Sequence, residues 1–318
     1  MSTSAVASGS VVLSVRDLVK VYKRGPRAND GISVEVDAGE VFGLLGPNGA
    51  GKSTFVQQVV GTLRPTSGTV AVRGVDVVAQ PERGKELCSV QMQGPVPLFG
   101  MRLREALELT ARIRGVPQAE AVRRSRELIK LLGLTEWADK PQFTVSGGVG
   151  RLTAFAMAVV APCALVVLDE PTNDVDPVRR EALWAEVRRV ADEGSAVLLV
   201  THNVLEAERV VDRMAILAHG RVVAQGRSAD LKRHAPCAFR IDLTLAGDAM
   251  PELPVVLHDL RRDGRRVRGG IAGGDFSVAS EWAYRLQQSG VVSEFVLGPV
   301  SLQDIYIGTV AEPPLAAS

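Results

Sequence analysis

The chain has 318 residues, of which 46% are hydrophobic and 23% are charged. This composition is typical of a globular protein with material for one large domain or two ordinary ones. The 37 lysines and arginines nearly balance the 36 aspartates and glutamates. The overall charge therefore argues against a protein that gathers nucleic acid or anionic membrane nonspecifically.

The cysteines and the apolar segments indicate the cellular compartment of the protein. Cys88, Cys163 and Cys237 lie far apart and outside any Cys-x-x-Cys spacing, which argues against disulfides and zinc and favours a reducing cytosol. Residues 1–10 lack the basic start and apolar stretch of a signal peptide, so we expect a disordered tail and no secretion. The apolar run at 154–168 is shorter than the roughly 20 residues of a membrane helix.

Segments rich in Val, Ile and Leu alternate with helical stretches along the first two thirds of the chain. Buried strands are expected at residues 41–45, 165–168 and 196–201, and the alternation predicts an α/β fold with a parallel sheet covered by helices. Between the first two strands, residues 102–134 have apolar side chains at helical spacing and Gly133 as a C-cap. We interpret residues 94–160 as an inserted helical subdomain.

The character of the sequence changes after residue 226, where strands resume and Pro and Gly become frequent. We expect a linker at 227–237, a small α+β domain at 238–310 that serves regulation or dimerisation, and a disordered tail at 311–318.

Within this second domain, Asp263-Gly264 suits the tight turn of a hairpin between strands at 255–262 and 265–271. A helix at 279–288 and a strand at 291–297 complete the predicted module.

A phosphate-binding loop follows the first buried strand. Its glycines allow backbone N–H groups to surround phosphates at the positive end of the next helix. Lys52 is expected at the β- and γ-phosphates, Ser53 at Mg²⁺ and Thr54 at the α-phosphate. The predicted ATP-binding residues are Gly46, Pro47, Asn48, Gly49, Ala50, Gly51, Lys52, Ser53 and Thr54.

Two further strand ends carry polar residues of the kind that phosphate hydrolysis needs. Asp169, after a buried strand, is expected to bind Mg²⁺ through water, and Glu170 to orient an attacking water. His202 follows the strand at 196–201, at the sheet edge where α/β proteins bind ligands. Its position alone is compatible with either a structural or a catalytic histidine.

The order and spacing of these motifs over residues 11–226 resemble the nucleotide-binding subunit of ABC transporters. The resemblance implies the P-loop NTPase fold of ABC type and places Tyr22 against the adenine, although a half-buried strand aromatic is the alternative. It makes Gln93 the Q-loop glutamine, which contacts Mg²⁺ and senses the membrane subunit. Gln91 is the alternative for that role. We prefer Gln93, because Leu98-Phe99 and residues 104–107 then align with the family's sequence pattern.

Val145-Ser146-Gly147-Gly148 resembles the signature sequence of this family, which binds the γ-phosphate of ATP held by the opposite subunit. The resemblance thus implies a head-to-tail dimer of nucleotide-binding subunits, most simply a homodimer. It also places Asp176 in the D-loop that links the two ATP sites, makes His202 the switch histidine, and assigns the role of general base to Glu170.

The segment after the signature departs from the family, which usually has Gln or Met and then a basic residue where this chain has Val149, Gly150 and Leu152. Gly150 weakens the start of a helix by about 1 kcal/mol relative to Ala. We expect ATP hydrolysis to persist at a reduced rate. A cassette that binds ATP with weak or no hydrolysis is the alternative.

The string at 298–306 is similar to the ending of drug- and antibiotic-export ATPases of the daunorubicin-resistance type, and residues 201–208 and 215–220 also resemble that subgroup. The resemblance implies a peripheral protein at the cytoplasmic face of the membrane, bound to a separate polytopic permease that exports a drug, antibiotic or lipid-like compound. The alternative is a soluble ABC ATPase acting on ribosomes or DNA. Such ATPases usually carry two cassettes in one chain or a long coiled-coil insertion, whereas this sequence has one cassette and no sustained heptad run.

Arginines cluster on the predicted hairpin of the second domain. Anionic lipid or nucleic acid could bind there, but a solvated hairpin face is the simpler interpretation. No aromatic side chains interleave to stack on bases, so no nucleic-acid partner is expected. The cluster consists of Arg261, Arg262, Arg265, Arg266 and Arg268.

Overall fold

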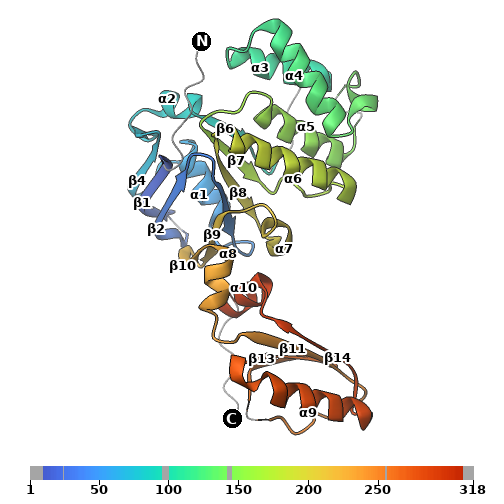
Figure 1. The fold of residues 1–318 in the computed structure, drawn as a ribbon. Coiled ribbons are helices and arrows are strands. Elements are labelled where there is room, and N and C mark those ends of the chain that lie inside the picture. Colours follow the sequence, from blue (N-terminus) through green and yellow to red (C-terminus); the bar gives the residue numbers. More distant parts are fainter. Residues whose placement is uncertain (1–9, 24, 95–99, 142–144, 255, 311–318) are drawn as a thin grey trace. The chain divides into compact units, whose positions relative to one another are not determined.

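The computed structural model describes residues 10–23, 25–94, 100–141, 145–254 and 256–310. It divides into two compact units, Met1–Gln225 and Gly226–Ser318, whose elements are labelled in Figure 1. The predicted tails at 1–10 and 311–318 lie almost entirely outside the described residues, as do Leu98 and Phe99.

A six-stranded sheet forms the centre of the first unit, with strand order β10-β9-β3-β8-β7-β6. Every residue of β3, β7 and β8 is buried, and these strands run parallel. Helices cover a parallel sheet on both faces, which explains the continuous apolar runs. The predicted α/β fold and its three buried strands are confirmed. The strands are β3 (Val41–Leu45), β6 (Cys88–Gln91), β7 (Leu165–Asp169), β8 (Ala196–Thr201), β9 (Arg213–Ala218) and β10 (Arg221–Gly226).

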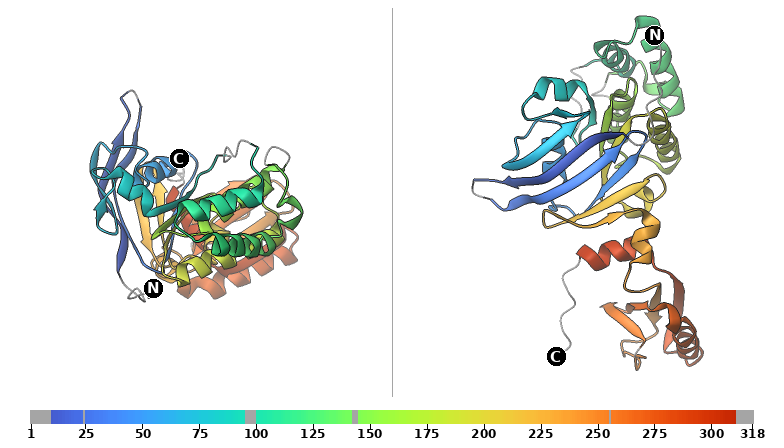
Figure 2. Two further views of the ribbon diagram at one scale, coloured as in Figure 1. Left: turned by 90° about the horizontal axis from the view of Figure 1, so that it is seen from above. Right: turned by 60° about the vertical axis from the view of Figure 1, so that its left-hand side comes forward.

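A second, antiparallel sheet with strand order β2-β1-β4-β5 belongs to the same unit. Its long strands β1 and β2 lie side by side in Figure 2. Helix α1 packs between the two sheets, because Phe55 and Val56 share one apolar cluster with Leu13 of β1 and Phe42 of β3. The bounds are β1 (Val11–Val21), β2 (Arg27–Asp37), α1 (Lys52–Val59), β4 (Ser67–Val72), β5 (Val75–Asp76) and α2 (Pro81–Glu86).

The predicted helical region consists of α3 (Leu103–Ile113), α4 (Gln118–Leu131) and, after η1 (Thr135–Trp137), α5 (Gly147–Val159). The chain turns between α3 and α4 at Gly115, which has a φ of 82°. Gly133 is left-handed with a φ of 63° and stands one residue beyond the C-cap Leu132. It therefore ends α4 as the sequence predicts.

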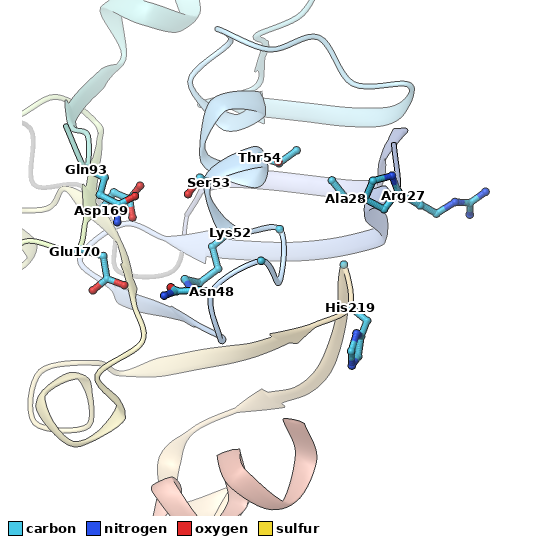
Figure 3. Close-up of a pocket in the computed structure, with 14 residues that line it drawn as sticks. Arg27, Ala28, Asn48, Lys52, Ser53, Thr54, Gln93, Asp169, Glu170 and His219 are labelled. Carbon is cyan, nitrogen blue, oxygen red and sulfur yellow. The ribbon is translucent and has the colours of Figure 1, made fainter. Parts of the chain in front are cut away.

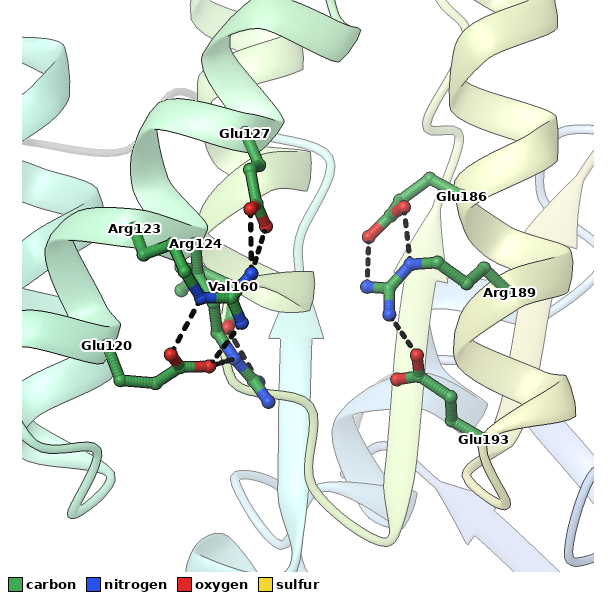
Figure 4. Close-up of polar contacts among 8 residues, drawn as sticks. All are labelled: Glu120, Arg123, Arg124, Glu127, Val160, Glu186, Arg189 and Glu193. Carbon is green, nitrogen blue, oxygen red and sulfur yellow. Dashed lines mark hydrogen bonds and ion pairs between the residues drawn. The ribbon is translucent and has the colours of Figure 1, made fainter.

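Ion pairs between residues one turn apart line the surfaces of α4 and α6 (Figure 4). Arg123 on α4 pairs with the glutamates one turn before and after it. Its neighbour Arg124 donates to the carbonyl of Val160 at 3.4 Å and so links α4 to the end of α5. On α6 (Pro177–Asp192), Arg189 pairs with Glu186, which is 2% exposed. The short helix α7 (Val204–Ala207) follows β8.

The second unit is an antiparallel sheet with strand order β12-β13-β11-β14. Helix α9 packs on one face and closes a separate apolar core, while α10 lies on the opposite side of the sheet (Figure 1). The bounds are α8 (Ser228–Arg233), β11 (Phe239–Leu245), β12 (Leu257–Asp263), β13 (Arg266–Ile271), η3 (Gly273–Asp275), α9 (Phe276–Gln288), β14 (Val292–Pro299) and α10 (Leu302–Val310).

The predicted hairpin is confirmed: β12 and β13 pair antiparallel, and Gly264 in the turn has a φ of 58°. Helix α9 begins three residues earlier than predicted, at Phe276. Two short helices were not predicted. They are α8, in the segment interpreted as a linker, and α10, which begins after reciprocal hydrogen bonds between Ser301 and Asp304. Among the described residues, no helix combines the length and apolarity needed to cross a bilayer.

Candidate functional site

The loop between β3 and α1 is shaped by a glycine at the helix start. Gly51 has a φ of 103°, and a Cβ there would lie 2.1 Å from the carbonyl oxygen of Ala28. Both observations require glycine. The buried side chain of Asn29 donates through Nδ2 to the Gly51 carbonyl at 3.1 Å and accepts from Gln58 Nε2 at 2.6 Å. The loop therefore rests on β2 and α1 through a buried polar contact.

Lys52, the first residue of α1, lies inside this loop. Its Nζ donates to the carbonyls of Gly46 at 2.6 Å and Pro47 at 3.0 Å, and the residue is 8% exposed. Burial lowers the pKa of Lys52, whereas the carboxylates of Glu170 and Asp169 oppose this change. The carbonyls of the loop therefore hold a buried cation, and the two nearby acids stabilise its charge.

Asp169 ends β7 at the same sheet edge and is 2% exposed. Burial raises the pKa of Asp169 to about 6, with a smaller contribution from the neighbouring Glu170 carboxylate, while Lys52 and Arg151 act in the opposite direction. Its buried Oδ2 has no hydrogen-bond partner among the described residues. A buried carboxylate oxygen with free coordination capacity suits a divalent cation that prefers oxygen ligands.

Glu170 follows directly and is fixed at both carboxylate oxygens. Oε2 accepts from Thr201 Oγ1 at 2.9 Å; Oε1 accepts from the backbone N–H of His202 at 3.0 Å and lies 2.6 Å from His202 Nδ1. The residue is 3% exposed and has a positive φ of 50°. The end of β8 therefore orients this carboxylate, while the His202 side chain remains half exposed.

These residues surround a cavity of about 510 Å³ (Figure 3). Lys52 and Asn48 face the acids from the loop, and Gln93 lines the same cavity as Asp169. The volume suits a small organic ligand. The cavity is lined by Pro26, Arg27, Ala28, Asn48, Gly49, Gly51, Lys52, Ser53, Thr54, Gln93, Asp169, Glu170, His219 and Gly220.

Five lining residues were not predicted: Pro26, Arg27, Ala28, His219 and Gly220. They come from the start of β2 and from the turn between β9 and β10. Backbone hydrogen bonds bring that turn to the phosphate loop, because Gly220 N–H donates to Ala50 at 3.1 Å and Gly220 accepts from Asp30 at 2.8 Å. No local motif marks these positions, since hydrogen bonds between segments far apart in the sequence assemble them.

Other predicted residues lie just outside the lining. Tyr22 follows β1 with its side chain 41% exposed, and its hydroxyl lies 3.5 Å from Thr54 Oγ1. The two candidate glutamines separate clearly, because Gln93 lines the cavity whereas Gln91 is 2% exposed within β6. The Gln93 carbonyl accepts from Arg151 Nη1 at 2.6 Å, which ties this segment to α5.

The signature segment begins α5. Ser146 is its N-cap residue, and both Ser146 and Gly147 are exposed. Gly148 packs closely, since a Cβ there would lie 2.3 Å from the carbonyl oxygen of Asp174. The unusual Val149 and Leu152 are 2% and 1% exposed. The two residues that depart from the family pattern therefore face the interior of the helical region, whereas Ser146 and Gly147 at the exposed start of α5 match the pattern.

Asp176 does not reach the cavity. It is the N-cap of α6, where its Oδ1 accepts from the backbone N–H of Arg179 at 3.1 Å. A side-chain cap of this kind stabilises a helix by roughly 1 kcal/mol. The structure therefore gives Asp176 a local contact beside the role that the resemblance implies.

Comparison with known proteins gives consistent matches. The sequence model of the ABC transporter family matches residues 29–173. The chain is 42% identical to the daunorubicin/doxorubicin resistance ATP-binding protein DrrA of Streptomyces peucetius, over 68% of this chain and 65% of that protein. It is 33% identical to the Nod factor export ATP-binding protein I of Ralstonia nicotianae, over 78% and 77%.

The match covers only 11% of another relative, the rat ATP-binding cassette sub-family A member 7. A solved structure described as the ATP-binding subunit of an ABC transporter has a TM-score of 0.66 and 30% identity, over 70% of this chain and 92% of that one.

Proposed function

Because the chain belongs to the family of ABC transporter ATP-binding proteins, the ABC ATPases, we propose that it hydrolyses ATP to power export through a separate membrane subunit. The main observation is the buried pair Asp169 and Glu170, which faces Lys52 across one cavity. Relatives named for daunorubicin/doxorubicin resistance and Nod factor export favour export of a drug, antibiotic or lipid-like compound.

ATP binds with its phosphates in the loop from Gly46 to Thr54. The backbone N–H groups at the start of α1 carry the positive end of the helix dipole toward the phosphates. The Lys52 ammonium leaves the carbonyls that it contacts in this structure and pairs with the β- and γ-phosphates. Tyr22, whose exposed ring stands next to Thr54, provides the stacking surface for adenine.

Ser53, Gln93 and Asp169 would hold Mg²⁺. All three line the same cavity, and Asp169 has a buried oxygen without a partner among the described residues. When bound, the ion would neutralise part of the phosphate charge during phosphoryl transfer. Since an acid must be deprotonated to bind a cation, the raised pKa of Asp169 makes this site sensitive to mildly acidic pH.

Glu170 orients the attacking water and accepts its proton. The hydrogen bonds from Thr201 and His202 fix the carboxylate before substrate arrives, so that little reorganisation is needed in the transition state. His202, half exposed beside this carboxylate, then contacts the γ-phosphate.

The site is completed by a second copy of the subunit in a head-to-tail dimer. Ser146 and Gly147 are exposed at the start of α5, where backbone N–H groups are available to a γ-phosphate on another subunit. Asp176 lies on the segment that follows Glu170 and would link the two sites. This dimer acts at the cytoplasmic face of the membrane, bound to the permease.

A steady-state ATPase assay on the complex with its membrane subunit tests the catalytic assignment. We expect Glu170→Gln to retain MgATP binding and to lose about 100-fold or more in turnover, as removal of a general base does. Glu181→Gln, at an exposed position on α6, is the matched control and should be unchanged. Equal activity in the wild type and Glu170→Gln would refute the role of Glu170. ATP binding without turnover in the wild type would show a non-hydrolysing cassette.

Lys52→Ala tests the coupling of ATP binding to export. Because this change removes the cation that faces the transferred phosphate, we expect loss of productive ATP binding and of efflux in cells. Undiminished drug resistance in that variant would contradict the proposal. Co-purification with a polytopic membrane protein is the expected outcome for the partner, whereas recovery with ribosomes or DNA would favour a soluble ABC ATPase.

A further inference from the structure

A second cavity, of about 500 Å³, lies entirely within the C-terminal unit. The strands β11, β12 and β13 form its floor, and α10 and the segment before β11 form its walls. This is the face of the sheet that α9 does not cover (Figure 1). None of the ATP-site residues lines it.

The strand pattern places arginines on this face. Ile241 and Val267 point to the core under α9 and are 1% exposed. Side chains alternate along a strand, so the opposite face receives Asp242 from β11 and Arg266 and Arg268 from β13. Two arginines on one strand of a small sheet face need anionic partners or water.

Four aspartates line the cavity, and two of them, Asp242 and Asp304, pair with other arginines. Asp242 accepts from Arg268 Nε at 2.6 Å and lies 3.7 Å from Arg240 Nε. Asp304 on α10 pairs with Arg240 Nη1 at 3.1 Å. The Nε atom of Arg240 is buried and has no hydrogen-bond acceptor among the described residues.

Three arginines of the cavity have no carboxylate partner among the described residues, and one of them, Arg262, donates instead to the carbonyls of Gly264 and Asp248. Arg261 on β12 stands directly opposite Arg268 in the strand register, a like-charge pair that is unfavourable by itself. Within the described part of the chain, its side chain donates only to the Ile307 carbonyl, at 3.4 Å. Arg266 stands opposite Asp263 without forming an ion pair in the described part of the chain. Arg261 and Arg266 are diagonal neighbours on one sheet face, so both guanidinium groups can reach a single anion.

Apolar side chains complete the walls, beside the charged Asp259 and Arg262. Pro236, Val300, Ile305 and Ile307 line the cavity from the segment before β11 and from α10. The lining thus combines apolar side chains with many charged ones, and the volume lies in the usual range for a site that binds a small organic ligand.

We propose that this cavity binds a small amphipathic organic anion. Its carboxylate or phosphate lies between Arg261 and Arg266, and its hydrocarbon body lies against Val300 and Ile305. A concave site that combines arginines with apolar side chains favours such a molecule over a nucleic acid or a flat membrane surface, which need an open basic face. The proposal does not depend on ATP hydrolysis.

Isothermal titration of the full chain with decanoate tests the ligand class. Acetate serves as an anion without a hydrocarbon body, and 1-octanol as a body without charge. We expect saturable binding of one decanoate and at least about tenfold weaker binding of each comparator, because each lacks one half of the recognition. If decanoate does not bind saturably, or if acetate or octanol binds equally well, the proposal is wrong.

Matched double variants locate the site. Arg261→Ala with Arg266→Ala should weaken decanoate binding at least about tenfold through loss of charge-assisted hydrogen bonds. Arg265→Ala with Arg285→Ala removes the same charge outside the cavity and should change binding less than about twofold. Equal weakening of decanoate binding in both double variants would show a general charge effect and contradict the proposal. If the wild type binds anionic vesicles or RNA, and both double variants lose that binding equally, the arginines belong to an open basic surface instead. Circular dichroism melts confirm folding; Arg266→Gln, at an exposed strand position, replaces any variant that does not melt cooperatively.

Discussion

Two consecutive carboxylates at the end of β7 meet different surroundings. Glu170 is surrounded by donors from Thr201 and His202, whereas Asp169 has an oxygen without a partner among the described residues. Hydrogen bonds stabilise a charged carboxylate, and burial without them destabilises it. Glu170 is thus a fixed carboxylate, suited to orient water. Asp169 is a carboxylate whose charged form would be stabilised by a bound cation.

The pH dependence of stability reports on Asp169. Its folded pKa of about 6 is raised above the ordinary value of 3.8, so the folded state binds more protons than the unfolded state between these values and stability falls as pH rises. We expect Asp169→Asn, measured without nucleotide or Mg²⁺, to be more stable than the wild type by on the order of 2 kcal/mol at pH 8. Urea unfolding from pH 5 to pH 8 should show this difference growing up to about pH 7 and then levelling off. A constant difference would show that Asp169 does not titrate in this range.

At the residue scale, the sequence predicts those parts of the site whose residues must be adjacent along the chain. The phosphate loop needs glycines, a lysine and a hydroxyl in fixed order, because one backbone turn presents them all. Arg27 and His219 line the same cavity without any such constraint. Hydrogen bonds between the turn after β9 and the phosphate loop bring His219 there, so no local pattern could have identified it.

Helix α5 shows how a single element combines structural and functional demands. Three of its first four residues are glycines, which is unfavourable for a helix interior. Their surroundings differ, because a Cβ at Gly148 would collide with the Asp174 carbonyl, whereas a Cβ at Gly150 would have no heavy atom within 4 Å among the described residues. The close approach at Gly148 joins the start of α5 to the segment after Glu170.

Alanine substitutions in α5 should therefore have opposite effects. We expect Gly150→Ala to stabilise the protein by about 0.5–1 kcal/mol through helix propensity, and Gly148→Ala to destabilise it by about 1–3 kcal/mol because the backbone of Asp174 must move. Denaturant unfolding of the two variants provides the comparison. Equal effects of both substitutions would show that α5 and the Asp174 segment are not packed as closely as the structure indicates.

Sequence predicts long, periodic elements better than short ones. The three buried strands and the hairpin turn at Gly264 follow directly from apolar runs and turn chemistry. Helices α8 and α10 have few residues, and neither has a sustained apolar stripe. The Ser301 and Asp304 contact that starts α10 does have a sequence signal, a capping residue followed by an acid three positions later. We related this segment to the C-terminal string of a subgroup of ABC ATPases and did not interpret it as a helix start.

At the scale of the whole molecule, the chain forms two units with separate apolar cores. One core lies between the two sheets of the first unit, and the other lies under α9. All residues that line the cavity beside the phosphate loop belong to the first unit, and all that line the arginine-rich cavity belong to the second. Sequence composition predicts the existence of two cores, but it carries no information on which surfaces of the smaller unit become concave.

Separate cores predict separate local stabilities. Leu243 is 1% exposed in the core under α9, and Leu198 is fully buried in β8. Replacing either leucine by alanine removes buried apolar volume and should cost about 2–4 kcal/mol. Because the two clusters share no residues, Leu243→Ala should accelerate amide exchange only in the second unit, whereas Leu198→Ala should accelerate it only in the first.

Hydrogen exchange followed by mass spectrometry distinguishes the two responses, and MgATP titration of the same proteins supplies an independent readout. We expect Leu243→Ala to bind MgATP with an affinity within about twofold of the wild type, since no residue of the second unit lines that cavity. Loss of exchange protection in both units, together with weakened ATP binding, would instead show that the units unfold as one and that the smaller core supports the ATP site.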